Sequence, residues 1–239
     1  MKLKPILIIA YWLLTAALFA VGVNLAFNHT PTDTQMGVVQ KIFYLHLPVA
    51  ITTFFAAMLV FIAGIGYIWQ RKAMWDHLAL ASGKVAVVFC GVVLLTGMTW
   101  GRAAWGVWWQ WTPRLTFSLV LWLLYVVYLT LRSSIESPQR RATVCAVYGI
   151  VAFLDVPLVY LSVRLFPQDM HPASISLDPD MKRTLLFWFL PVILLAAGLI
   201  VSGYRLAARQ AALGSVKLGQ SESSTSGGAA PGFLTRGAL

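Results

Sequence analysis

The chain has 239 residues, of which 59% are hydrophobic and only 11% are charged, and its formal net charge is +10. This composition argues against a soluble globular protein, because so few charged residues cannot cover a water-facing surface. The lysines and arginines are distributed between apolar segments and do not form one basic patch, so the sequence predicts no nucleic-acid partner.

The apolar segments predict an all-α polytopic membrane protein with six transmembrane helices. A run of about 20 apolar residues can cross the hydrocarbon of a bilayer as a helix. The six segments are Ile6–Phe27, Ile42–Trp69, Val85–Thr99, Leu115–Leu131, Thr143–Val163 and Leu185–Tyr204. They leave no room for a soluble domain, so residues 1–204 are expected to form one membrane domain in contact with lipid.

The remaining segments predict the orientation of the chain in the membrane. Most of the 18 lysines and arginines fall in segments on the same side as the N-terminus. Basic residues are enriched on the cytoplasmic side of membrane proteins, so both termini are expected in the cytoplasm. Residues 205–239 are rich in Ala, Gly and Ser and are predicted to be a disordered cytoplasmic tail. The outer loops are expected to include residues 100–114 and 164–183.

One outer loop is exceptionally rich in tryptophan. Five tryptophans lie within twelve residues, and two arginines accompany them: Trp100, Trp105, Trp108, Trp109 and Trp111, with Arg102 and Arg114. Indole rings favour sites that are apolar on one side and wet on the other. An aromatic belt at the membrane interface explains one or two such residues but not five. The loop is therefore interpreted as a platform for a large, flat, anionic ligand, although Arg114 could instead anchor the next span.

Two histidines are expected on the same side of the membrane as the tryptophans. His46 lies near the outer end of the second span and His171 lies in the last outer loop. Imidazole is a common axial ligand of haem iron, indoles can cover the macrocycle, and arginines can pair with the propionates. Zinc would need further nitrogen, sulfur or carboxylate ligands and has no use for the tryptophans. The combination therefore favours haem.

Two cysteines and one aspartate within the spans are expected to have structural roles. Cys90 and Cys145 are expected to be buried small side chains, because no Cys-x-x-Cys or covalent haem-attachment motif is present. Asp155, two residues before Pro157, is expected to hydrogen-bond backbone groups that the proline frees, in preference to binding a ligand directly.

Three motifs resemble the haem exporter protein C family, CcmC, of cytochrome c maturation. The run WGVWWQWTPRLT from Trp105 to Thr116 resembles the tryptophan-rich signature of the haem-handling proteins. The run KIFYLHLP from Lys41 to Pro48 resembles the first histidine motif, and VPLVYLSV from Val156 to Val163, followed by His171-Pro172, resembles the second. The likeness covers roughly residues 41–200, and the larger relatives CcmF and CcsA would need more spans.

The resemblance implies a function and a set of site residues. CcmC-like proteins sit in the bacterial inner membrane, hold haem on the periplasmic side and pass it to the haem chaperone CcmE. His46 and His171 match the two axial-ligand positions, and the tryptophan run matches the haem-docking platform. The resemblance implies non-covalent haem b in transit, a CcmD-like small protein and CcmA- and CcmB-like transporter subunits as partners. This is handover of a cofactor and not turnover of a substrate.

The sequence departs from the family at two points. Thr112 stands where the signature usually has Asp, and Leu165-Phe166 lies near the place where paired tryptophans are expected. The departures concern docking of the chaperone more than binding of haem. Two other functions are considered: a b-type haem subunit that passes electrons, which would place histidines within the spans, and a small-solute permease, which would need broken helices and a polar site near the midplane.

Overall fold

The computed structural model describes residues 3–166, 171 and 176–226, and within this part of the chain the regular structure is helical. In chain order the helices are α1 (Leu3–Asn24), α2 (Phe43–Gln70), α3 (Ala73–Trp105), α4 (Pro113–Ser134), α5 (Pro138–Ala152), α6 (Asp155–Leu165) and α7 (Pro179–Ser226). A short π-helix, Leu25–His29, extends α1, and a 3-10 helix, Val38–Ile42, leads into α2.

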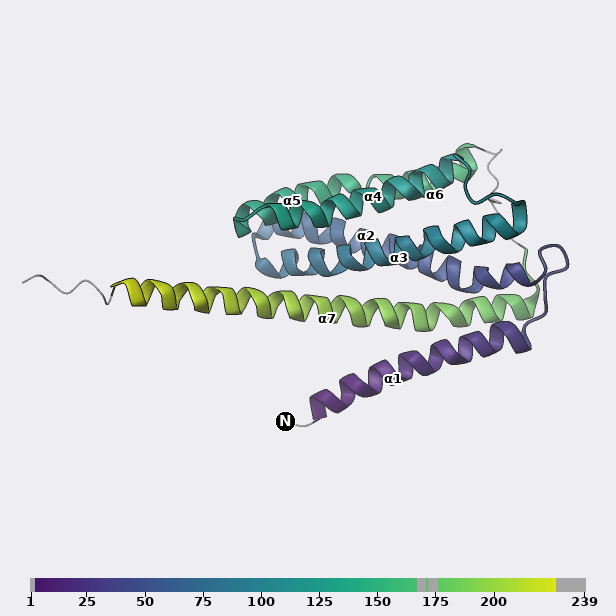
Figure 1. Cartoon of the computed structure of the whole chain (residues 1–239), viewed down its shortest axis with the longest axis horizontal. Coiled ribbons are helices and arrows are strands. Elements are labelled where there is room, and N and C mark those ends of the chain that lie inside the picture. Colours follow the sequence, from purple (N-terminus) through teal and green to yellow (C-terminus); the bar gives the residue numbers. More distant parts are fainter. Residues whose placement is uncertain (1–2, 167–170, 172–175, 227–239) are drawn as a thin grey trace, which may run out of the picture.

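The prediction of six membrane spans is confirmed for the described residues. The six segments long and apolar enough to cross a bilayer are Pro5–His29, Val38–Gln70, Ala73–Trp105, Pro113–Ser134, Pro138–Leu165 and Pro179–Gly214. The N-terminus of α1 and the far end of α7 lie at the same end of the bundle, as an even number of spans requires (Figure 1).

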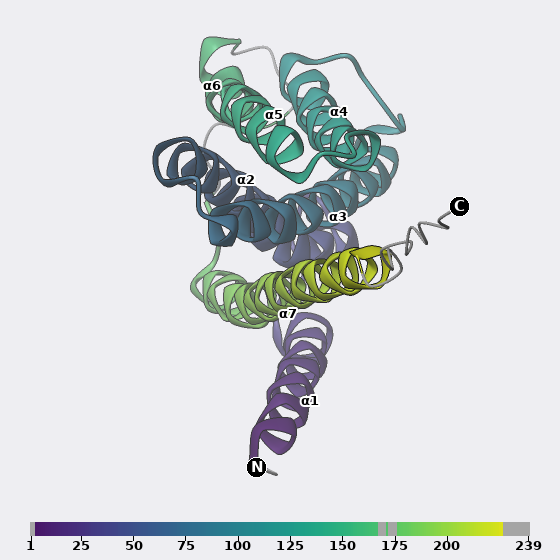
Figure 2. The same cartoon turned by 90° about the vertical axis from the view of Figure 1, so that its left-hand side faces the viewer.

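The helices form layers. α1 packs on α7, α7 packs on α2 and α3, and the helices α4, α5 and α6 cover the opposite side of the α2–α3 pair (Figure 2). α1 is the outermost element, and only 11% of its most apolar window is buried. In a membrane this helix exposes its apolar side chains to lipid, because lipid tails solvate them as well as protein does.

Helix α3 is longer at both ends than the sequence predicts. The segment between the expected second and third spans, residues 70–84, shrinks to a turn at Arg71. The left-handed backbone of Arg71 (φ 54°) lets its N–H bond to the carbonyl of Tyr67. Polar residues such as Asp76 do not interrupt a helix in the way that Gly or Pro does. Asp76 instead accepts two hydrogen bonds from Arg132 of α4, at 2.6 and 2.7 Å. At 33 residues, α3 is about 50 Å long and extends beyond the hydrocarbon at its ends.

The predicted fifth span is divided into α5 and α6. Pro157 has no N–H to bond the carbonyl of Phe153, and the chain tightens there instead. The N–H of Leu154 bonds to the carbonyl of Val151, and that of Val156 bonds to the carbonyl of Phe153, each at 3.0 Å. The two helices therefore meet at a break within the span.

The last span also ends later than expected. The sequence predicts a span to Tyr204 and a disordered tail over residues 205–239, whereas α7 continues as a helix to Ser226. The segment after Tyr204 contains Ala, Leu, Arg and Gln, which are good helix formers, so it extends the preceding helix. Residues 227–239 of the predicted tail lie outside the described residues.

Candidate functional site

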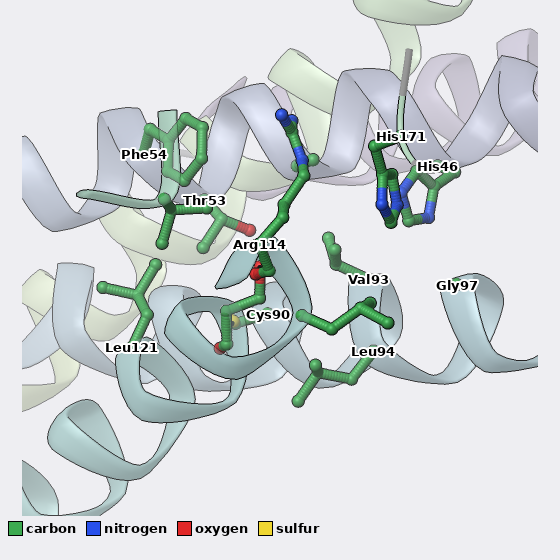
Figure 3. A pocket seen from close by; sticks show the side chains of 14 residues that line it. His46, Thr53, Phe54, Cys90, Val93, Leu94, Gly97, Arg114, Leu121 and His171 are labelled. Carbon is green, nitrogen blue, oxygen red and sulfur yellow. Dashed lines mark hydrogen bonds between the residues drawn. The ribbon is translucent and has the colours of Figure 1, made fainter. Parts of the chain in front are cut away.

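A hollow lies between α2, α3, α4 and α6 and is partly open to the surroundings. His46 and His171 line it together with Arg114, and Figure 3 shows the two imidazoles next to each other. Farther along the wall are Thr53, Cys90 and Leu121. The fold thus brings the two predicted histidines to one place.

His46 is held by α3, the neighbouring helix. Its Nδ1 lies 2.8 Å from the hydroxyl oxygen of Thr96. Its ring meets the indole of Trp100 edge to face, with centroids 6.0 Å apart. The imidazole also lies close to α3 at Gly97, where a Cβ would make an ordinary van der Waals contact of 3.4 Å with Cε1 of His46.

His171 is held from the end of the same helix. Its ring meets the indole of Trp105 edge to face, with centroids 5.8 Å apart. His171 belongs to the long segment between α6 and α7, and its neighbours 167–170 and 172–175 lie outside the described residues. Trp100 and Trp105 therefore each contact one of the two histidines.

The five tryptophans lie at the end of α3 and in the loop that follows it. Trp100 and Trp105 belong to α3, whereas Trp108, Trp109 and Trp111 follow it. Trp109 and Trp111 meet edge to face with centroids 5.6 Å apart. The side chains of Trp108 and Trp111 are 56% and 74% exposed. Trp100 and Trp105 thus contact the histidines, Trp108 and Trp111 are exposed, and Nε1 of Trp109 is buried.

Local sequence explains the path of the loop that follows α3. Gly106 ends α3 with φ 77°, a left-handed conformation that glycine adopts without strain. Gly101 lets the loop return close to the helix, because a Cβ there would lie 3.2 Å from the carbonyl oxygen of Val107. Thr112 caps the N-terminus of α4 by accepting a hydrogen bond from the N–H of Leu115 at 3.5 Å, and Pro113 opens the helix.

The two arginines of the loop have different environments. Arg102 is exposed and donates a hydrogen bond to the carbonyl of Gly106, so it secures the end of its own helix. Arg114 lies in the first turn of α4 and lines the hollow. From the sequence, both arginines were predicted to pair with an anionic ligand. The structure places only Arg114 at the hollow.

The donors at this site suit a flat anionic metal complex better than a bare metal ion. Among the described residues no group of three or more His, Cys, Asp or Glu side chains could hold a metal ion. The described lining of the hollow contains two imidazoles, one arginine and mostly apolar side chains. The buried Nε1 atoms of Trp100 and Trp109 have no hydrogen-bond partner in the described part of the chain.

Sequence reasoning missed Thr96 and Gly97, which form the wall behind His46. A signal was present, since Thr96 and Gly97 lie four and three residues before Trp100, the spacing that places residues on the same side of a helix. The predicted span, Val85–Thr99, stops just before Trp100, so the residues that share a helix side with Trp100 were not recognised.

The other singled-out residues are buried. Cys90 and Cys145 are free and buried, as expected, and Sγ of Cys90 lies 3.6 Å from the carbonyl oxygen of Ser118. Asp155 is 6% exposed and opens α6, but its Oδ2 has no hydrogen-bond partner in the described structure. The expected bonds from this oxygen to freed backbone groups are therefore not formed.

Comparison with known proteins agrees with the resemblance. The family model described as Heme exporter protein C matches residues 1–221. The protein named Heme exporter protein C from Escherichia coli strain K12 is 32% identical over 202 residues, covering 81% of each chain. The protein of that name from Bradyrhizobium diazoefficiens is 32% identical over 165 residues, which cover 69% of this chain and 63% of the relative, a little under two thirds of its length. The protein of that name from Paracoccus denitrificans is 31% identical over 170 residues, covering 71% of this chain and 70% of the relative. The chain belongs to the Heme exporter protein C family.

Proposed function

We propose that the protein binds haem non-covalently at the periplasmic face of the bacterial inner membrane and delivers it to a CcmE-like chaperone during c-type cytochrome biogenesis. Family membership implies haem handling in cytochrome c biogenesis. The observation that carries the proposal is the convergence of His46 and His171, far apart in sequence, on one hollow that also contains Arg114.

Each type of residue at the proposed site would contact a different part of the haem. Each imidazole has a nitrogen that can bind iron from one side, so His46 and His171 are the proposed axial ligands. Trp100 and Trp105 lie against these imidazoles and supply apolar surface for the macrocycle. The guanidinium of Arg114 suits a propionate carboxylate, because its planar N–H groups match the two oxygens. The cargo in this proposal is haem b.

Release requires that the site be reachable from outside the protein. The hollow is partly open, and the indoles of Trp108 and Trp111, in the loop that leads from α3 to α4, are exposed. Exposed aromatic side chains are frequent contact points between proteins. We propose that the chaperone docks against Trp108 and Trp111 while it takes haem. CcmD-like and CcmA- and CcmB-like proteins are the further proposed partners, and the protein transfers its cargo without converting it.

Purification with and without added haem tests the proposal. The wild type supplied with haem should show the absorption bands of six-coordinate iron, and His46→Ala and His171→Ala should each lose haem and shift these bands. His77→Ala is a matched control, because His77 packs against Tyr204 on α7 at the inner end of α3. Unchanged spectra and haem content in both single variants would refute the assignment of ligands.

A further inference from the structure

The contact between His46 and Thr96 determines which ring nitrogen of His46 faces the hollow. Nδ1 of His46 lies 2.8 Å from Oγ1 of Thr96. A neutral imidazole carries one N–H and one lone pair, so this contact can be made with either atom as the donor. The other hydrogen bonds of the Thr96 hydroxyl decide which of the two atoms is the donor.

Thr96 has one hydroxyl proton, and the backbone of α3 accepts it. Oγ1 lies 2.7 Å from the carbonyl oxygen of Val92 and 3.2 Å from that of Val93. Threonine hydroxyls in helices commonly donate to carbonyls three or four residues earlier. With its proton directed at the backbone, Oγ1 can only accept from His46. The Nδ1 atom therefore carries the proton, and Nε2 keeps the free lone pair.

The rest of α3 fixes the plane of the ring. The imidazole lies against α3 at Gly97, where a Cβ would be at van der Waals distance, 3.4 Å, from Cε1. The indole of Trp100 stands at 82° to the imidazole on the next turn and also contacts Phe43. The ring is thus oriented by one hydrogen bond and by the shape of the α3 surface beside it.

We propose that Thr96 is the positioning residue for His46: it holds the imidazole in the tautomer with the proton on Nδ1, so that Nε2 is the nitrogen offered to iron. This inference rests on the proposed function of His46. A hydrogen bond from the second ring nitrogen of a ligating histidine orients the ring and increases its basicity. Loss of such a partner reduces metal affinity about 10–100-fold.

The test compares Thr96→Val, which keeps the branched shape but loses the oxygen, with Thr96→Ser, which keeps the oxygen. Thr99→Val is the matched control, because Thr99 is exposed on the same helix and bonds to the carbonyl of Leu95 at 2.9 Å. Nitrogen-15 NMR of haem-free protein with labelled histidines reads the tautomer, and the His46 signal is identified by its loss in His46→Gln.

Wild type, Thr96→Ser and Thr99→Val should show the proton on Nδ1, and Thr96→Val should show a mixture of tautomers. With haem supplied, Thr96→Val should retain haem about 10–100-fold less tightly, and Thr96→Ser should restore retention. An unchanged tautomer in folded Thr96→Val would overturn the inference. Loss of haem in His46→Ala with no effect of Thr96→Val would also overturn it and leave the proposed function intact, whereas no effect of His46→Ala would reject His46 as a ligand.

Discussion

The indole of Trp105 meets the imidazole of His171 edge to face, with ring centroids 5.8 Å apart and planes at 70°. Trp100 meets His46 in the same way one and a half turns earlier on α3, at 6.0 Å and 82°. The C-terminal end of a single helix, α3, therefore contacts both histidines of the hollow. Because α3 is continuous to Trp105, it can hold the two imidazoles at a fixed separation.

The first prediction concerns these two tryptophans. Trp100→Leu and Trp105→Leu should each weaken haem retention a few-fold to about tenfold, because an aromatic pair contributes about 0.5–1.5 kcal/mol beyond the area it buries. Equilibrium titration of haem-free protein with haem gives the affinity. Trp69→Leu, at the far end of α2 and 83% exposed, should leave it unchanged. Equal effects of all three substitutions would show that the indoles act only through general stability.

The second prediction separates Arg102 from Arg114. Arg114→Ala should reduce haem affinity and its dependence on ionic strength, because a charge-assisted bond to a carboxylate is lost. Arg114→Lys should restore only part of the affinity, since an ammonium group lacks the planar pair of donors. Arg102→Ala should leave haem binding nearly unaltered, because this side chain bonds to the carbonyl of Gly106. A larger effect at Arg102 than at Arg114, measured by haem titration at two salt concentrations, would contradict the assignment.

The third prediction addresses the departure at Thr112. The side chain caps α4 by accepting from the N–H of Leu115, and Asp is as good a cap as Thr. Thr112→Asp should therefore fold and bind haem like the wild type, and Thr112→Ala should lower the free energy of unfolding by about 1 kcal/mol. Thermal unfolding in detergent measures the effect. A gain of haem affinity in Thr112→Asp without a change in stability would mean that a carboxylate here has a role beyond capping.

The fourth prediction concerns Asp155, whose buried Oδ2 has no partner in the described structure. Asp155→Leu should raise the apparent melting temperature, because a buried polar atom without a hydrogen bond costs about 1–3 kcal/mol. Haem retention should stay at the wild-type level, since Asp155 does not line the hollow. A folded Asp155→Leu protein that fails in haem delivery would instead show that the carboxyl group takes part in function.

The break at Asp155 shows what a sequence pattern can and cannot decide. Pro157 predicts that backbone bonds are missing there, and the helix does divide into α5 and α6. The pattern did not predict that the Asp155 carboxyl oxygen stays without a donor, because that depends on how the freed carbonyls rearrange. Here the N–H groups of Leu154 and Val156 bond to nearby backbone carbonyls in a tight turn.

Arg102 and Arg114 illustrate a second limit. Both arginines lie beside the tryptophans in sequence, so composition and spacing predict ligand binding equally for the two. The structure distinguishes them, because α3 continues through Arg102 and is capped by Gly106. Arg102 therefore bonds to the end of its own helix. Helix ends depend on local breaks such as Gly106, and the sequence interpretation placed the end of the span several residues too early.

The sequence alone determined the number of spans, because six apolar segments of roughly the length that a bilayer requires are separated by more polar segments. It also placed both histidines and the tryptophans in segments expected on one side, since successive spans alternate in direction. Only the tertiary structure decided which side chains meet: Thr96 with His46, Trp105 with His171 and Arg114 with the hollow. Such contacts depend on how neighbouring helices are rotated and packed against each other. The hydrophobic pattern predicts only which side of each helix faces its neighbours.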